Sequence, residues 1–244
     1  YLNFKNIVIG LVILSIGIIK KVFIADNLSI FSDEIFLINS NFNLLETWLG
    51  TFCFTFQIYF DFSGYIDMAT GIAMMFNIKL PLNFNSPYKA TGIIDFWQRW
   101  HITLTSFLTS YIYTPLLRSF KDLNFFKAMI ATVIVFLIAG LWHGPSWLFV
   151  IFGAMHGFGL VVNHVYRRFS KFRLNIFLSR ALTFFYVNLT FVFFRSESLQ
   201  DAMFLIKTMF GLNFIQNQNL LAFKMSNVSF AVLIASLIIC FLFK

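Results

Sequence analysis

Four histidines are the side chains best suited to chemistry in this sequence: His101, His143, His156 and His164. A positioned imidazole can take or give a proton near neutral pH. His143 stands in Gly140-Leu141-Trp142-His143-Gly144-Pro145, where glycine and proline end an apolar segment and leave backbone groups without helical partners. Two interpretations of His143 stay open: an acid/base group that a substrate can reach, and a helix-end histidine wetted at an interface.

The other three histidines have weaker local contexts. His101 lies among tryptophans, where an imidazole either packs or serves a site. His156 falls within the small-residue patch Gly153–Gly157, which is typical of close helix packing and favours a structural role. His164 stands near a basic segment and is interpreted as interfacial.

A polar stripe gives a further candidate. In the apolar segment Leu44–Phe76, Gln57 and Asp61 share one helical face with Gly64. A carboxylate at a bilayer centre costs at least about 2.5 kcal/mol, so this face should avoid lipid. Asp61 then either forms a structural pair or lines a cavity with Gln57.

Several enzyme classes lack their motifs in this sequence. We find no His-Glu-x-x-His for a zinc protease, no Gly-x-Ser-x-Gly elbow and no phosphate-binding glycine loop. Cys53 and Cys240 lie far apart in apolar segments and are interpreted as buried thiols. No metal site is predicted, and imidazole acid/base chemistry remains.

The composition indicates a membrane protein. The chain has 59% hydrophobic and 11% charged residues, against about 25% charged in soluble domains, and 36 phenylalanines. The net charge of +8 comes from basic residues that flank apolar runs, such as Lys20-Lys21 and Arg167-Arg168. That placement fixes topology toward the cytoplasm and does not favour nucleic-acid binding.

Six segments are long and apolar enough to be candidate spans, since a span needs about 20 residues. They are Ile7–Ala25, Leu44–Phe76, Phe125–Trp142, Trp147–Tyr166, Ile176–Phe194 and Val228–Phe243. The expected fold is all-α, a polytopic membrane helix bundle. We expect residues 1–244 to form a single membrane domain, the later part of a longer chain whose N-terminal helices are missing here.

The segment Ile94–Tyr111 is too polar to span the membrane. At helical spacing, Trp97, Trp100 and Leu104 fall on one side, and Asp95 and Arg99 fall on the other. The pattern predicts an amphipathic helix that lies at the interface or re-enters a polar cavity.

Several motifs together resemble the membrane-bound O-acyltransferase family, in its bacterial polysaccharide branch. That branch includes alginate and peptidoglycan O-acetyltransferases and the teichoic-acid D-alanyl transferase. The matching segments are Lys20–Asn27, Gln57–Tyr65, Asp95–Leu104, Tyr111–Leu116, Gly140–Gly144, Gly153–Gly157 and Phe194–Ser198.

The resemblance implies an MBOAT-like fold and transfer of an acetyl or other short acyl group. The donor would be a cytoplasmic thioester, acetyl-coenzyme A or an acyl carrier, and the acceptor a hydroxyl of an extracytoplasmic envelope polysaccharide. It implies His143 as the catalytic residue and His101 as the second site histidine. Substrate contacts are expected from Asp95, Arg99, Trp142, Asp61 and Gln57.

The same resemblance implies further properties of the protein. It would bind no cofactor beyond the donor thioester, lie in the cytoplasmic (inner) membrane and cooperate with a periplasmic esterase-like acetyltransferase. Two other classes fit the sequence. A transporter or flippase would use the Gln57 and Asp61 stripe as a substrate path, and a non-catalytic scaffold of an envelope complex would need neither His101 nor His143.

Overall fold

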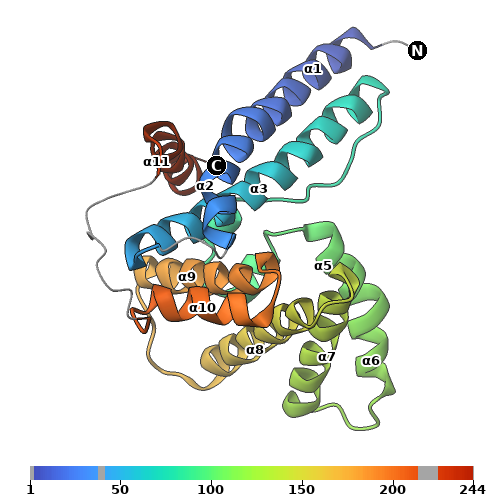
Figure 1. The fold of residues 1–244 in the computed structure, drawn as a ribbon. Helices are drawn as coiled ribbons and strands as arrows, with labels where there is room; N and C mark the ends of the chain where they lie inside the picture. The colour runs from blue at the N-terminus through green and yellow to red at the C-terminus, as the bar shows by residue number, and fades with distance from the viewer. Residues whose placement is uncertain (1–2, 38–41, 214–224, 244) are drawn as a thin grey trace. The chain divides into compact units, whose positions relative to one another are not determined.

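The computed structural model describes residues 3–37, 42–213 and 225–243 (Figure 1). Within those ranges the chain forms helices and loops and no strand. The prediction of an all-α membrane bundle is confirmed. The chain divides into two compact units, one formed by Tyr1–Asn83 with Phe204–Lys244 and the other by Phe84–Met203.

The first unit is built on three segments that pack along one another. Helix α1 spans Phe4–Ile18, continues through the π-helical turn η1 (Ile19–Ala25) and ends in α2 (Asp26–Phe36). The 32-residue α3, Leu44–Met75, packs against all three. Helix α11, Asn227–Leu242, packs against α2 and α3.

Paired glycines let α1 and α3 approach closely. A Cβ on Gly10 would lie 2.5 Å from the carbonyl oxygen of Gly71, and one on Gly17 would lie 2.6 Å from that of Gly64. On each helix the two glycines are seven residues apart, so both lie on the same face of that helix. The two backbones therefore touch where any side chain would force them apart.

A buried acid begins α3. Glu46 is 2% exposed, yet its carboxylate accepts a hydrogen bond from the Asn43 backbone N–H at 3.0 Å. The Asn43 side chain in turn accepts from the Glu46 N–H at 2.9 Å, which completes a capping box. This buried carboxylate belongs to the helix start and has no need of a ligand.

The second unit contains the candidate histidines. Its helices are α4 (Ile93–Trp97), α5 (Ile102–Leu108), the π-helical η3 (Thr109–Tyr113), α6 (Thr114–Ser119), α7 (Phe125–His143), α8 (Trp147–Phe169) and α9 (Ile176–Arg195); a 3-10 turn, η2 (Pro87–Lys89), precedes them. Helix α10, Leu199–Met209, crosses the boundary between the units. The second unit is built on a hairpin of α7 and α8. These two helices approach so closely at Gly140 and Gly153 that a Cβ on either glycine would collide with the backbone of the other helix. The expected close packing of the Gly153 patch is confirmed.

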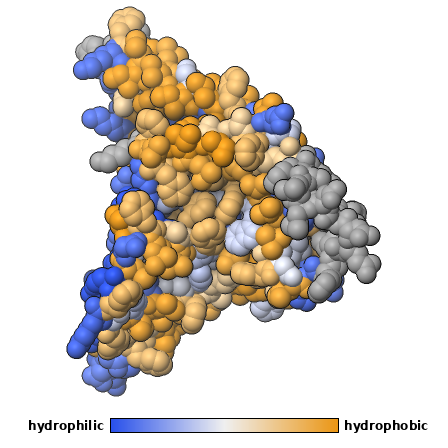
Figure 2. Space-filling model, turned by 90° about the vertical axis from the view of Figure 1, so that its left-hand side faces the viewer, coloured by the Kyte–Doolittle hydropathy of each residue, from blue (hydrophilic) through white to orange (hydrophobic). Residues whose placement is uncertain are grey.

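Four helical segments of the described chain are long and apolar enough to cross a membrane. They are Phe4–Phe36, Phe125–His143, Trp147–Phe169 and Ile176–Arg195. The face shown in Figure 2 is accordingly dominated by hydrophobic side chains. The chain is a multi-pass membrane protein.

Two of the six expected spans are not among those four. Helix α3 follows the predicted bounds but is not among the helices apolar enough to cross a membrane. Helix α11 is apolar but only 16 residues long, below the usual length of a span.

The prediction of one continuous amphipathic helix over Ile94–Tyr111 is wrong. The helix stops after Trp97 and restarts at Ile102, because His101 adopts a left-handed backbone conformation (φ 43°, ψ 56°). Hydrophobic periodicity continues through this break, so the side-chain pattern alone does not reveal it. The apolar side is only partly buried: Trp97 and Trp100 are enclosed, whereas Tyr111 is 71% exposed.

Candidate active site

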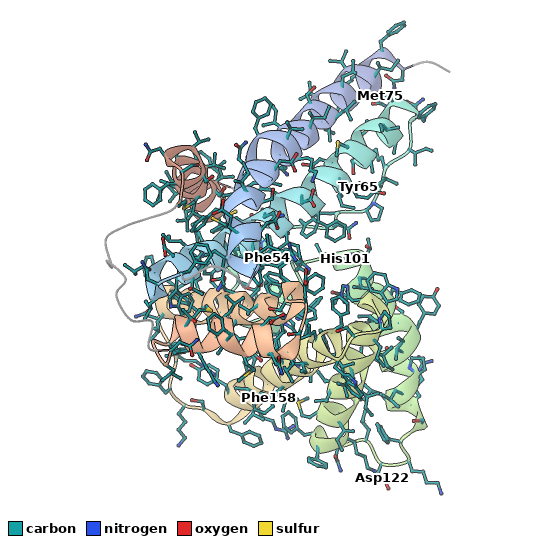
Figure 3. The ribbon with its side chains drawn as sticks, in the orientation of Figure 1. Phe54, Tyr65, Met75, His101, Asp122 and Phe158 are labelled. Atoms are coloured by element: carbon teal, nitrogen blue, oxygen red, sulfur yellow. The ribbon has the colours of Figure 1, made fainter. Side chains whose placement is uncertain are left out.

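His101 occupies the turn between α4 and α5 (Figure 3). A left-handed conformation costs a non-glycine residue about 1–2 kcal/mol, so surrounding contacts must hold it. The Thr105 hydroxyl donates to the Trp97 carbonyl at 3.0 Å, which closes the gap between the two helices. Partial burial lowers the pKa of His101 below 6.5, so its imidazole is neutral at physiological pH.

Asp95 and Arg99 stabilise the approach to that turn. Arg99 Nε contacts the Asp95 carboxylate at 2.6 Å, and the same carboxylate accepts from the Thr91 N–H at 3.0 Å. Arg99 also donates to the Asn85 carbonyl at 3.2 Å, and the Asn85 N–H donates to the Arg99 carbonyl at 2.9 Å. In the structure Asp95 and Arg99, both predicted to contact substrate, stabilise the loop before α4.

His143 is the last residue of α7, as the Gly-Pro break predicts. Gly144 follows with φ 156°, and a Cβ there would lie 2.9 Å from the Phe149 ring. The backbone therefore leaves the helix immediately after the imidazole, at a position where a larger residue would collide with an aromatic ring. Ser146 then caps α8 by accepting from the Leu148 N–H at 3.2 Å.

Aromatic rings surround the His143 imidazole on several sides. The ring centroids of Trp142, Phe194, Phe152 and Phe149 lie 5.0, 5.2, 5.8 and 6.0 Å from its own. Among the described residues, none hydrogen-bonds either nitrogen of this half-buried ring. The two ring nitrogens of His143 thus lie among aromatic rings, and both remain available to hydrogen-bond a substrate. Trp142 is 64% exposed and covers one side.

His156 shows the opposite arrangement, in a fully buried position on α8. Trp97 Nε1 donates to its Nδ1 at 3.1 Å, which places the ring proton on Nε2. Nε2 lies 2.9 Å from the Thr190 hydroxyl, which donates onward to the Val187 carbonyl at 2.7 Å. This hydrogen-bond chain joins α4, α8 and α9, and it gives His156 the structural role expected from its sequence.

His101, His143 and His156 all belong to the Phe84–Met203 unit. Phe152 contacts both His143 and His156, with centroid distances of 5.8 and 4.6 Å. The structural His156 is therefore packed next to the His143 ring through one shared phenylalanine.

Gln57 and Asp61 belong to the first unit, and their contacts lie within it. Lys21 Nζ lies 2.7 Å from the Asp61 carboxylate and 2.9 Å from that of Asp26. Gln57 Oε1 is buried with no hydrogen-bond partner in the part of the chain that the structure describes. Asp61 is thus found in a structural pair, one of its two expected roles.

Sequence reasoning missed two sets of contacts. Lys20 and Lys21 were interpreted as topology signals, but they pair with Asp67 and Asp61 at 2.6 and 2.7 Å. Lysines inside an apolar run next to a segment with two aspartates could have indicated this pairing. The aromatic frame from Phe149, Phe152 and Phe194 carries no comparable signal, because phenylalanine occurs throughout the chain.

No cluster of three or more metal-ligating side chains occurs among the described residues. The candidate site comprises the His101 and His143 imidazoles, the Asp95–Arg99 ion pair and the aromatic rings around His143. Such a site can exchange protons and can orient a substrate in a medium of low polarity.

Comparison with known proteins gives a consistent result. The model of the membrane-bound O-acyltransferase family, MBOAT, matches residues 1–163. Peptidoglycan O-acetyltransferase of Helicobacter pylori is 48% identical over 217 residues, which cover 87% of this chain and 41% of that protein. The probable alginate O-acetylase AlgI of Pseudomonas aeruginosa is 37% identical over 195 residues, 80% of this chain and 37% of that protein.

A third relative is more distant. Teichoic acid D-alanyltransferase of Streptococcus thermophilus is 31% identical over 126 residues, 49% of this chain and 30% of that protein. The chain spans less than half the length of each of these three relatives.

Proposed function

Because this chain belongs to the membrane-bound O-acyltransferase family, we propose that the protein transfers a short acyl group across the membrane to envelope polysaccharide hydroxyls. The observation that carries the proposal is the His143 imidazole, which is held by aromatic rings and left without a hydrogen-bond partner among the described residues. A ring so placed can bond to a substrate hydroxyl without first breaking an internal contact.

The proposed chemistry is general-base acyl transfer. His143 takes the proton of the acceptor hydroxyl while the hydroxyl oxygen attacks the thioester carbonyl. An ester C–O bond forms, the C–S bond breaks, and the leaving thiolate receives the proton that His143 carries. A positioned base of this kind typically contributes about 10²–10⁴ in rate. The aromatic rings limit the access of bulk water on the sides that they cover, and water would otherwise compete as the acceptor.

His101 is proposed to orient donor or acceptor beside His143. Its turn is held by Thr105, and its neutral ring can either donate or accept a hydrogen bond. Asp95 and Arg99 fix the loop before this turn, so a direct contact with substrate is a second role added to their structural one. Trp142, Gln57 and Asp61 remain proposed substrate contacts.

The proposed acyl group is acetyl. The 48% identity to a peptidoglycan O-acetyltransferase exceeds the 31% identity to a D-alanyltransferase, which favours acetyl as the acyl group. We propose acetyl-coenzyme A or an acyl carrier as the cytoplasmic donor and a periplasmic esterase-like protein as the partner. The cytoplasmic membrane is the proposed location, because the proposed donor and acceptor would lie on its opposite sides.

The test uses the full-length protein in proteoliposomes, with thioester supplied on one side. His143→Ala should lower acetyl transfer by at least about 100-fold. His164→Ala is the matched control, because it removes an imidazole near the C-terminal end of α8, away from the break that follows His143. Wild-type rates in His143→Ala would refute the assignment. Passage of the intact polymer without thioester consumption would instead favour a flippase.

A further inference from the structure

A cavity in the Phe84–Met203 unit is lined by neither His101 nor His143. It has a volume of about 420 Å³ and lies between α8, α9 and the start of α4. Its lining includes Phe158, Val162, Asn163, Tyr166, Leu182 and Tyr186. Figure 3 labels Phe158 on α8, one of the residues that border it. Its size is within the range of ligand pockets.

Several polar groups of the cavity lining are already bonded to the protein. The Tyr186 hydroxyl donates to the Met155 carbonyl at 2.5 Å, and the Tyr166 hydroxyl donates to the Phe172 carbonyl at 2.9 Å. Asn163 Oδ1 accepts from the Ile94 N–H at 3.2 Å. The cavity therefore offers mainly hydrocarbon, and an occupant held chiefly by hydrogen bonds would find few free partners.

The apolar residues at this cavity are also open to their surroundings. Phe158 is 64% exposed, Leu182 53% and Val162 49%, and all three lie on segments long enough to span the membrane. An open, apolar cavity on such segments is accessible to the lipid tails around it. A hydrocarbon chain can enter sideways without crossing water.

Positive charge gathers at one end of the cavity. The Arg173 guanidinium lies 6.0 Å from the centroid of the Tyr166 ring, which itself lines the cavity. Arg167 is in the last turn of α8, directly after Tyr166. Arg168 is occupied differently, because its guanidinium lies 4.6 Å from the Phe125 ring centroid. Arg173 is exposed, and its guanidinium lies against a ring that lines the cavity.

We infer that this cavity binds an anionic phospholipid, with an acyl chain along Phe158, Val162 and Leu182 and the phosphate at Arg173. Tail and headgroup requirements are met at adjoining positions, which is the arrangement an amphiphile needs. Basic residues at this end of α8 place the headgroup in the cytoplasmic leaflet, where positive flanks reside. A guanidinium binds phosphate with charge-assisted hydrogen bonds. The inference is independent of the acyl-transfer proposal.

The experiment measures lipid binding by electron paramagnetic resonance on the full-length protein in phosphatidylcholine nanodiscs. Chain-labelled phosphatidylglycerol or chain-labelled phosphatidylcholine is added in trace amounts. We expect the immobilised fraction to be several-fold larger for phosphatidylglycerol. Arg173→Gln should bring the two fractions close to equality, while Arg118→Gln, an exposed arginine on α6, should leave the preference intact.

A second pair of variants tests the acyl-chain position. Leu182→Trp should fill the cavity and reduce immobilisation of the phosphatidylglycerol label, whereas Leu178→Trp, one turn earlier on α9 and outside the lining, should not. Equal fractions for both lipids in the wild type would overturn the inference. Displacement of the label by acetyl-coenzyme A would also overturn it, by assigning the cavity to the donor.

Discussion

His143 and His156 lie in one helical hairpin and share contact with Phe152, yet their surroundings differ completely. His156 is wholly buried, and both its nitrogens are hydrogen-bonded. His143 is half-buried, and its ring has no hydrogen-bond partner among the residues that the structure describes. Neighbouring imidazoles of the same type can therefore be assigned to scaffold and site by whether their bonding capacity is already used.

The largest effect expected from this comparison is on stability at His156. His156→Ala removes a buried ring and leaves Trp97 Nε1 and the Thr190 hydroxyl without their partner. The free energy of unfolding should fall by about 3–5 kcal/mol. Chemical denaturation in detergent measures it, with His143→Ala as the control, expected to change stability by less than about 1.5 kcal/mol. Equal losses in the two variants would remove the distinction between scaffold and site.

The strained turn at His101 gives the next effect. Alanine there keeps the left-handed penalty, whereas glycine relieves it. His101→Gly should be more stable than His101→Ala by about 1 kcal/mol, although both lack the imidazole. The same denaturation assay compares them. If alanine were as stable as glycine, the turn would not be strained, and the break between α4 and α5 would need another cause.

The Asp95–Arg99 ion pair, which stabilises the loop before α4, should contribute about 1 kcal/mol or less to the free energy of unfolding. The reason is that both side chains are partly exposed. Asp95→Asn weakens the contact with Arg99 while an oxygen remains for the Thr91 N–H. Limited proteolysis of the loop near Asn85 measures the loss, which should be smaller than for Asp95→Ala. Loss of acetyl transfer without faster proteolysis would show that Asp95 acts on the substrate.

The smallest effect concerns pH. The folded-state pKa of His101 lies below the unfolded value of 6.5, so the unfolded chain binds more protons between these two pKa values. Stability should therefore be fully present above pH 6.5 and decline as the pH falls through the folded pKa. His101→Gln should make this part of the pH dependence flatter in thermal unfolding. An unchanged slope would assign the decline to other groups.

The sequence predicted the helical fold and the position of the His143 break well, because apolar runs and a Gly-Pro pair are local signals. It failed at His101, since a left-handed residue leaves hydrophobic periodicity intact on both sides. The pairing of Lys21 with Asp61 joins two helices far apart in the sequence, so local patterns show the charges but not the partner. The bonding state of His156 likewise depends on Trp97 and Thr190, which only folding brings together.

The central claim is that His143 supplies the base, and chemical rescue tests it most directly. In full-length protein, His143→Gly should lower acetyl transfer by at least about 100-fold, and added imidazole should restore part of that activity in a concentration-dependent way. His156→Gly, whose ring is structural, should show no such recovery. Full activity of His143→Gly without imidazole would contradict the account.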